Sequence, residues 1–243
     1  NFWGPTGNEG PCGPTTELYI DGIEVWNLVF NEYYSNPDKT LKKLENPGID
    51  TGMGFERLAA VLQGVKDVYE TDLLEPIMEE VERLTPGLEK KIRKIFVDHL
   101  RAISFLIADG VRPSNKESGY ILRRLIRRIL SYKIQYDIHS DFWIGILPLV
   151  IKKYNDYYPD LKIIETAVSI IDEEKQKFEL AISSSESQKI LQGDKPLTGG
   201  ELFYLHGTLG VDAGTTVGIV FGSRITEETL DEFQKLQKNH QEI

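Results

Sequence analysis

Residues 48–58 combine two closely spaced glycines, an arginine and the start of an apolar run. They read Gly48-Ile49-Asp50-Thr51-Gly52-Met53-Gly54-Phe55-Glu56-Arg57-Leu58. Glycine lets the backbone take angles that other residues avoid and approach a ligand closely, and the start of a helix presents free N–H groups to an anion. We therefore predict a glycine-permitted turn that leads into a helix, with Arg57 placed to grip phosphate oxygens in two-point fashion. The alternative is an ordinary surface turn with a solvated Glu56/Arg57 pair.

Strand and turn patterns precede this segment. Residues 1–16 are dense in Gly, Pro and Thr, which indicates a loop. Asp21-Gly22 stands between two apolar stretches, a pattern that favours a β-hairpin whose second strand runs to about Tyr34. A further short strand is expected at 41–44. These patterns predict an antiparallel sheet up to about residue 50, followed by a helix.

Beyond residue 72 the strand signals largely end, and apolar residues recur at helical spacing. The expected helices cover 72–84, 92–106, 118–132, 143–154, 161–191 and 227–238. Thr198 is a candidate N-cap for one more helix, and the Gly- and Thr-rich stretch 207–222 is expected to be irregular or short-stranded. A sheet followed by helices predicts an α+β chain with two domains, residues 1–66 and 67–243.

The composition narrows the class of protein. The chain has 243 residues, of which 40% are apolar and 27% charged, as in ordinary globular proteins. Its one cysteine, Cys12, excludes an internal disulfide framework and favours a reducing compartment, so we expect a cytoplasmic protein. No apolar run approaches the length of a membrane span. The four histidines are widely spaced and one cysteine cannot complete a structural zinc site, so no zinc is expected.

The charge of the chain is unevenly distributed. The formal net charge is −10, yet residues 89–133 hold twelve Lys or Arg against four Asp or Glu. This segment therefore carries a local net charge of +8, and the rest carries −18. Such asymmetry predicts one face for an anionic partner. The alternative is a helix with a solvated basic face.

Six segments occur in a definite order. They are 1–4, 10–17, 24–30, 50–57, 109–115 and 123–128. This ordered set resembles the alanyl-tRNA synthetases, a family of class II aminoacyl-tRNA synthetases. The first four segments resemble the C-terminal part of the catalytic domain with its antiparallel sheet, and 50–57 looks like the third signature motif of the class. The last two resemble the mainly helical tRNA-recognition domain, and the resemblance reaches to about residue 205.

The resemblance implies an alanine–tRNA ligase. Such an enzyme uses ATP and Mg²⁺ to activate alanine as alanyl-adenylate, and then transfers the alanyl group to tRNA(Ala). Two further signature motifs precede this point in the family and are not found in the chain. The resemblance therefore implies a fragment or split subunit that is not active alone and needs the N-terminal remainder of the enzyme in cis or in trans.

The resemblance also implies roles for residues in the first half of the chain. Arg57 is the match for the arginine that holds the ATP γ-phosphate, beside Gly52 and Gly54 in the nucleotide site. Glu24 is the expected Mg²⁺ ligand. The alanine site is expected to comprise Asp50 as the anion for the ammonium group, Asn27 as a substrate contact, and Trp3 and Val29 as walls. Glu24 and Asn27 stand three residues apart and so face opposite ways unless their strand twists or bulges.

The alternatives to these roles are structural. Glu24 can be an edge-strand carboxylate, Asn27 a buried amide bonded to backbone, and Trp3 a core aromatic.

In the second half of the chain, the basic and amide residues indicate RNA binding. The pairs Arg123/Arg124 and Arg127/Arg128 repeat every four residues and are expected to form one stripe that contacts phosphates of the tRNA acceptor stem. The resemblance makes Asn115 the match for an asparagine that helps read a G·U wobble pair in the minor groove. The alternatives are a solvated arginine face and an ordinary turn asparagine.

The chain departs from the family at a second recognition point. Typical members carry aromatic-Asp-Thr-aromatic-Gly-Phe-Pro, whereas residues 206–212 read His206-Gly207-Thr208-Leu209-Gly210-Val211-Asp212. Gly207 replaces the aspartate that assists wobble-pair reading, and Asp212 replaces the proline. We therefore expect weaker wobble-pair discrimination, or a substitute reader such as His206 or Asp212.

Two competing functions are compatible with the sequence. The first is a non-catalytic tRNA-binding module that keeps the helical domain. The second is a class II ligase that activates a different acid.

Overall fold

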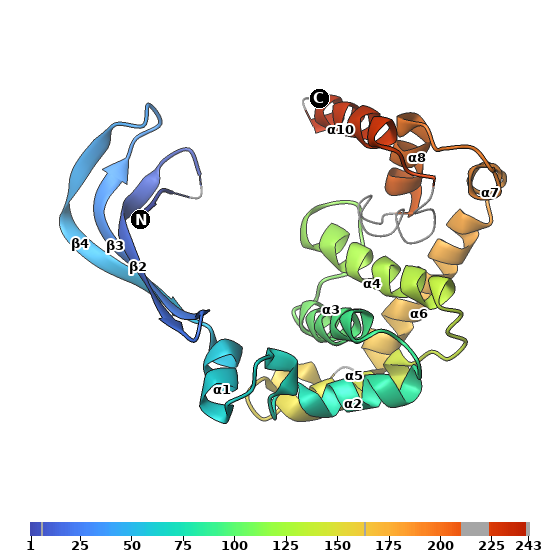
Figure 1. Ribbon diagram of the computed structural model, residues 1–243, viewed down its shortest axis with the longest axis horizontal. Coiled ribbons are helices and arrows are strands. Elements are labelled where there is room, and N and C mark those ends of the chain that lie inside the picture. The colour runs from blue at the N-terminus through green and yellow to red at the C-terminus, as the bar shows by residue number, and fades with distance from the viewer. Residues whose placement is uncertain (6, 163, 210–223, 242–243) are drawn as a thin grey trace. The chain divides into compact units, whose positions relative to one another are not determined.

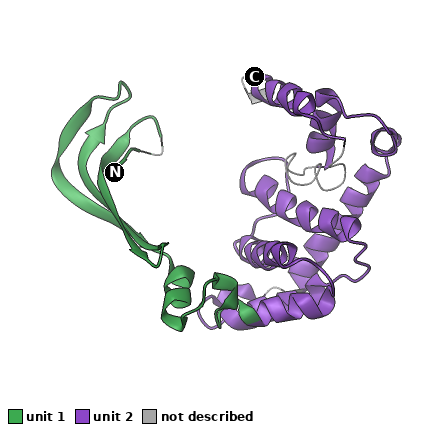
Figure 2. Ribbon diagram, in the orientation of Figure 1, with its two compact units in different colours: residues 1–75 green, residues 76–243 purple. Residues whose placement is uncertain are grey.

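A computed structural model describes residues 1–243 except 6, 163, 210–223 and 242–243 (Figure 1). The chain divides into two compact units, residues 1–75 and 76–243, which Figure 2 shows in different colours. This division lies beyond the expected position near residue 66, because the intervening stretch is bonded to the first unit. At the end of helix α1 (Phe55–Gln63), the Gln63 side chain donates to the Asp72 carboxylate at 2.7 Å and accepts from the Asp72 amide at 3.0 Å.

The first unit is built on an antiparallel sheet. Its strands are β1 (Phe2–Trp3), β2 (Gly10–Ile20), β3 (Ile23–Ser35) and β4 (Leu41–Met53), in that spatial order. The Asp21-Gly22 hairpin is confirmed, with φ of 49° and 82° at its two turn residues, the positive values that a tight β-hairpin requires. Helix α1 follows β4, and the 3-10 helix Val68–Glu70 follows α1.

Two expectations for this unit are wrong. Residues 10–16 belong to β2 rather than to a loop, and Gly13 makes this possible because a Cβ at that position would lie 1.7 Å from the Phe30 carbonyl oxygen. Strand β4 does not end at residue 44 but continues to Met53, with an irregular register near Pro47. Gly52 therefore lies in a strand, and Gly54, with φ −72°, is the N-cap of α1 rather than part of a special turn.

The second unit is helical. Its helices are α2 (Glu75–Leu84), α3 (Lys90–Ala108), α4 (Glu117–Gln135), α5 (Trp143–Tyr154), α6 (Ile164–Ile182), α7 (Ser185–Leu191), α8 (Gly199–Leu209) and α10 (Glu227–Gln241), with a 3-10 helix at Pro159–Leu161. Helix α2 begins on the last residue of the first unit. The core is formed where α3, α4 and α5 pack together around Phe96, whose ring stacks on Phe142 with centroids 4.6 Å apart. These helices confirm the α+β class.

The cap expected at Thr198 is also confirmed. The Thr198 hydroxyl accepts from the Glu201 amide at 3.2 Å, and the Glu201 carboxylate accepts from the Thr198 amide at 2.8 Å, which is a capping box. Helix α8 runs to Leu209, so the expectation of irregular structure is wrong for 207–209, and 210–222 lie outside the described residues.

None of the helices in the described part of the chain combines the length and the apolar character that crossing a bilayer requires.

Candidate functional site

A bulge in β3 decides which side chains share a face of the sheet. Tyr19 pairs with Glu24 and Leu18 pairs with Trp26, so Val25 is an extra residue without a partner across β2. Glu17, which pairs with Asn27, is two residues from Tyr19, and residues two apart in a strand face the same way. Glu24 and Asn27 therefore lie on one face of the sheet. Residues three apart in a regular strand would face opposite ways, and the bulge at Val25 removes that difference.

The same face continues onto the neighbouring strands. Asn27 pairs with Gly52 and Val29 pairs with Asp50 in β4. Trp3 pairs with Gly13 of β2. Gly13 lies two residues before Thr15, which pairs with Val29, so Trp3 and Val29 share the same face. We call this the site face, and the sequence-predicted residues that the register places on it are Trp3, Glu24, Asn27, Val29, Asp50 and Gly52. Within the described residues Trp3 is 37% exposed and is not a core aromatic.

Arg57 lies at the end of the site face, beside Glu24. It occupies the first turn of α1, and its Nη1 donates to the Glu24 carbonyl oxygen at 3.0 Å and lies 3.7 Å from the Glu24 carboxylate. Gly54 gives the arginine room, because a Cβ there would lie 3.1 Å from the Arg57 Cδ. The Gly54 amide donates to the Val25 carbonyl at 2.9 Å, which ties the start of α1 to the bulge. A half-exposed cation and a carboxylate are thus held side by side.

Two residues of the site face were missed by the sequence reasoning, Thr15 and Glu17. The Asn27 amide nitrogen donates to the Thr15 hydroxyl at 3.3 Å and to the Glu17 carboxylate at 3.4 Å. Asn27 is therefore a half-buried amide bonded to side chains. The Tyr19 hydroxyl donates to Glu17 at 2.8 Å, and this bond raises the pKa of Tyr19 above its usual value. Alternation along residues 15, 17 and 19 could have identified this row, had 10–16 been recognised as strand.

Among the described residues, the carboxylates suit a Mg²⁺ ion that is bound mainly by a nucleotide rather than by the protein. No group of three or more His, Cys, Asp or Glu among them could hold a metal ion by itself. Mg²⁺ bound with a nucleotide typically takes one or two carboxylates and completes its shell with phosphate oxygens and water. Glu24, on the site face and next to Arg57, matches this mode, in which the phosphates rather than the protein supply most ligands.

In the second unit, the four arginines of α4 do not form one stripe. Arg127 is buried, with Nε 2.5 Å from the Glu174 carboxylate of α6, and its Nη1 donates to the Thr208 carbonyl of α8 at 2.8 Å. The expected stripe therefore does not include Arg127, because this side of α4 packs against α6 and Arg127 reaches the Thr208 carbonyl of α8. Arg124 and Arg128, one turn apart, remain half-exposed.

Arg123 and Asn115 are brought together. The Arg123 guanidinium donates to the Asn115 side-chain oxygen, and the guanidinium carbon lies 5.5 Å from the centre of the Tyr120 ring. Burial, reinforced by the positive charge of Arg127, lowers the pKa of Arg123 from its usual value. Arg124 lies over the same Tyr120 ring, also at 5.5 Å. The exposed Asn115 is thus oriented by a cation from the next helix.

Gly207 lies on the exposed side of α8, and a Cβ added there would meet nothing within 4 Å. A larger side chain therefore fits at this position. The ring of the neighbouring His206 makes an edge contact with Phe233, with centroids 5.4 Å apart. Asp212, the other proposed substitute reader, lies outside the described residues.

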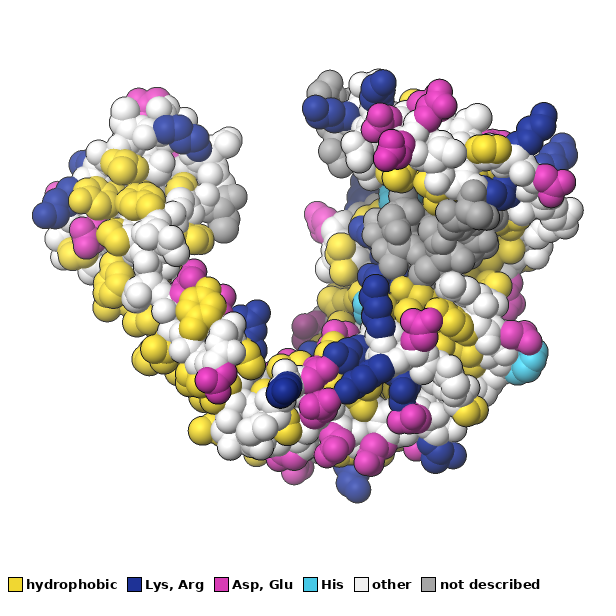
Figure 3. Space-filling view, viewed as in Figure 1, with side chains coloured by type: hydrophobic (Ala, Val, Ile, Leu, Met, Phe, Trp, Pro, Cys, Tyr) yellow, Lys and Arg dark blue, Asp and Glu magenta, His cyan; other side chains and the backbone are white. Residues whose placement is uncertain are grey.

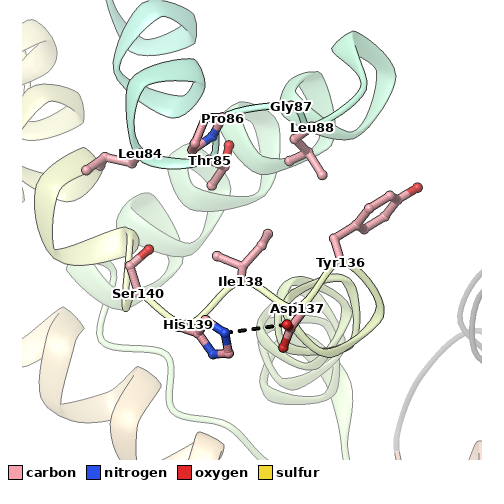
Figure 4. Close-up of a pocket in the computed structure, with 10 residues that line it drawn as sticks. All are labelled: Leu84, Thr85, Pro86, Gly87, Leu88, Tyr136, Asp137, Ile138, His139 and Ser140. Carbon is pink, nitrogen blue, oxygen red and sulfur yellow. Dashed lines mark ion pairs between the residues drawn. The ribbon is translucent and has the colours of Figure 1, made fainter.

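A cavity of about 290 Å³ lies elsewhere in the second unit, between the loop joining α2 to α3 and the loop after α4. Figure 4 shows Ile138 projecting into the space between the two loops and the ion pair of Asp137 with His139, whose atoms are 3.4 Å apart. None of the sequence-predicted site residues lines this cavity.

Comparisons with known proteins confirm the resemblance. The family described as tRNA synthetases class II (A) matches residues 1–243. The chain is similar to the alanine–tRNA ligase of Petrotoga mobilis, with 36% identity over 98% of this chain and 31% of that protein. It is also similar to the alanine–tRNA ligases of Stenotrophomonas maltophilia, with 38% identity over 73% of the chain, and of Treponema pallidum, with 36% identity over 86% of the chain. The chain spans between 23% and 40% of the length of these relatives. It belongs to the class II (A) tRNA synthetases.

Proposed function

We propose that this chain supplies part of the active site and the tRNA-binding surface of an alanine–tRNA ligase, with residues 1–66 in the catalytic domain and 67–243 in the tRNA-recognition domain. The observation that carries the proposal is the meeting of Glu24, Asn27 and Asp50 on one sheet face, with Arg57 at its end. Such a face offers a cation for phosphates and separate anions for a metal and for an ammonium group. The protein acts in the cytoplasm together with the N-terminal remainder of the enzyme.

Each side chain has a distinct task in this proposal. Arg57 grips the γ-phosphate of ATP, and the strand glycine Gly52, beside the N-cap glycine Gly54, leaves room for the nucleotide, since a Cβ at Gly52 would meet nothing within 4 Å. Mg²⁺ held by Glu24 would neutralise phosphate charge. Asp50 holds the ammonium group of alanine. The carboxylate of the alanine then approaches the α-phosphate in a fixed orientation. Positioning and charge neutralisation of this kind supply most of the catalysis in phosphoryl chemistry.

The alanine site is closed by its walls and by Asn27. Trp3 and Val29 limit the size of the side chain that fits, while Asn27 is held by Thr15 and Glu17. A wall of this kind excludes larger side chains but discriminates weakly against glycine or serine.

The test of the function is ATP–pyrophosphate exchange by an enzyme that contains this chain and the upstream class II motifs. Exchange that depends on alanine supports the proposal. Exchange that depends on another amino acid identifies a ligase of different specificity, and tRNA binding without any exchange identifies a non-catalytic module.

Replacing Asp50 by asparagine is expected to raise the KM for alanine by at least about tenfold and to leave the KM for ATP nearly unchanged. The ammonium group loses its one proposed anion, and a hydrogen bond to a charged group contributes about 1.5–3 kcal/mol. The measurement is exchange kinetics with each substrate varied in turn. Glu45→Gln, an exposed carboxylate on the same strand, is the matched control. Equal effects on both KM values would make Asp50 a structural residue of β4.

For RNA, the proposal places Arg124 and Arg128 against phosphates of the acceptor stem, with Asn115 and Arg123 nearby. Arg127 is buried and supports this surface indirectly, by donating a hydrogen bond to the Thr208 carbonyl. The support is the local charge of +8 over residues 89–133 in an acidic chain. Dark blue side chains gather over α3 in the view of Figure 3, with acidic ones beside them.

Replacing both Arg124 and Arg128 by alanine is expected to flatten the salt dependence of tRNA binding. Removing one phosphate contact reduces the slope of log affinity against log salt by about 0.7 to 0.9. The slope is measured by fluorescence anisotropy with labelled tRNA(Ala) over a salt series. Lys152→Ala, an exposed cation on α5, is the control and should leave the slope unchanged. A double variant with the wild-type slope would make these arginines a solvated face.

Gly207→Asp is expected to increase discrimination between tRNA carrying a G·U pair and tRNA carrying G·C at the same place. The added carboxylate has open space on α8 and can accept a hydrogen bond from the guanine amine, a contact that contributes about 1–3 kcal/mol of discrimination. The measurement is the ratio of kcat/KM for the two tRNAs. Gly207→Ala fills the same space without an acceptor and should leave the ratio unchanged.

The ratio of kcat/KM for the two tRNAs in the wild-type enzyme decides whether discrimination is reduced or whether another residue replaces the missing aspartate. A small ratio means that Asn115 carries a reduced preference alone. A large ratio that His206→Ala or Asp212→Ala destroys means that a substitute reader is present. A large ratio that survives both changes would show that this end of α8 does not face the acceptor stem.

A further inference from the structure

The guanidinium of Arg123 is already engaged within the second unit. Its Nη1 donates to the side-chain oxygen of Asn115, in the loop before α4. The guanidinium carbon lies 5.5 Å from the centre of the Tyr120 ring, and Nε is buried without a hydrogen-bond partner among the described residues. A group that is bonded at one end and buried along its stem is poorly placed to follow an RNA phosphate, although its charge alone would suggest that role.

The backbone that carries Asn115 is held in place as well. The Ser114 amide donates to the Gly119 carbonyl at 3.0 Å, and the Ser114 hydroxyl accepts from the Lys116 amide at 3.2 Å. Gly119 permits this close approach, because a Cβ there would lie 2.3 Å from the Ser114 hydroxyl oxygen and 2.6 Å from the Arg112 carbonyl oxygen. The exposed Asn115 therefore projects from a loop that is anchored on the first turn of α4.

The contact with Arg123 decides which end of the Asn115 amide is offered to RNA. A guanidinium donates through every N–H group and has no acceptor, so the atom of Asn115 that it binds is the oxygen. The amide nitrogen, which can only donate, is then the group that Asn115 presents. It suits the acceptors of a minor groove, which are purine N3, pyrimidine O2 and the ribose hydroxyls. It does not suit the exocyclic amine of guanine, which is itself a donor.

We propose that Arg123 is a positioning residue for base recognition: it holds the Asn115 amide with the nitrogen outward, as a hydrogen-bond donor to an acceptor atom on a base edge. This rests on the proposed tRNA function and gives Arg123 a task that differs from the phosphate contacts of Arg124 and Arg128. Holding the side chain in advance strengthens binding, because less side-chain freedom is lost when the RNA arrives.

The first experiment separates hydrogen bonding from charge at position 123. Fluorescence anisotropy measures binding of the 243-residue chain to two labelled RNA hairpins that differ only in carrying a G·U or a G·C pair. Arg123→Met cannot donate and should reduce the preference for the G·U hairpin by about two- to tenfold, the effect of losing one hydrogen bond. Arg123→Gln has no charge but can still donate through its amide nitrogen, so it should keep most of the preference.

The neighbouring arginine provides a contrasting variant. Arg124 is half-exposed, and its guanidinium carbon lies at the same distance of 5.5 Å from the Tyr120 ring. Arg124→Met should reduce the slope of log affinity against log salt by about 0.7 to 0.9, as for one lost phosphate contact, without altering the preference. Asn115→Ala should lower the preference as much as Arg123→Met does. The double variant should lower it no further, because both residues act through one contact.

The second experiment tests which end of the amide faces the RNA. Replacing the guanine of the G·U pair by inosine removes the exocyclic amine and leaves N3 in place. The cost of this replacement is expected to be the same for the wild-type chain and for Asn115→Ala. A cost that is present in the wild type and disappears in Asn115→Ala would show that Asn115 accepts from the amine, and the proposed orientation would be wrong.

The outcomes separate this proposal from the proposed RNA surface. If Arg123→Met lowers the salt slope as Arg124→Met does and keeps the preference, then Arg123 contacts a phosphate and only its positioning role is overturned. Equal losses of preference in Arg123→Gln and Arg123→Met also overturn that role, as does a wild-type chain without any preference. A wild-type chain that binds neither hairpin overturns the RNA surface as well. Circular dichroism and thermal unfolding of each variant show whether the fold is retained.

Discussion

Replacing Arg57 by alanine is expected to reduce ATP–pyrophosphate exchange by about 10²–10³-fold while the fold remains intact. Removing one preorganised group that stabilises charge in a transition state typically costs about 10²–10³ in rate, and Arg57 is proposed to bind the pyrophosphate that leaves. The side chain is 53% exposed and makes one hydrogen bond and one long ion pair, so little of the core depends on it.

The variants that accompany Arg57→Ala separate charge from geometry. Arg57→Lys retains the charge and loses the planar fork, so it should recover only a small part of the activity. Arg83→Ala removes an exposed helical arginine that pairs with Glu80 and should leave exchange unchanged. Near-normal exchange by Arg57→Ala would mean that the residue only ties α1 to β3 through Glu24.

Replacing Arg127 by alanine is expected to lower the free energy of unfolding of the helical unit by about 3–5 kcal/mol, because it leaves the Glu174 carboxylate buried without its cation. The two side chains are 5% and 2% exposed and their atoms approach to 2.5 Å, so solvent cannot replace the missing partner. The substitution also releases the Thr208 carbonyl at the end of α8. The measurement is urea unfolding followed by the helical circular dichroism signal.

A second variant shows whether the destabilisation comes from the Glu174 carboxylate that is left buried without a cation. Replacing Arg127 and Glu174 together by methionine should recover part of the stability, since a buried ion pair can often be exchanged for apolar side chains at little cost. Arg124→Ala, on the same helix but half-exposed, should change stability by less than about 1 kcal/mol. A small effect of Arg127→Ala would indicate that water reaches Glu174.

Local signals in the sequence predicted much of this fold correctly. Positive φ values at Asp21 and Gly22 follow from residue types that tolerate them, and the Thr198–Glu201 capping box uses groups three residues apart. The helices follow from apolar spacing, since burying one stripe of each is the main stabilising term. The basic segment and the order of the motifs are likewise properties of the sequence alone.

Strand pairing was the part that local patterns missed. Glycines and prolines at 10–16 indicated a loop, yet the stretch is a strand, because its residues pair with β3 and, at Gly13 and Pro14, with β1. The space required at Gly13 is set by a carbonyl seventeen residues later, at Phe30, and no local rule anticipates it.

The sequence by itself determined the α+β class and the family, and it supplied the residues of the candidate site. The tertiary structure decided which of those residues meet. The bulge at Val25 turned Glu24 and Asn27 to one face, and packing against α6 and α8 buried Arg127 while leaving Arg124 at the surface. Both results depend on groups distant in sequence, because register and burial arise from pairing and packing between elements rather than from the preferences of any one segment.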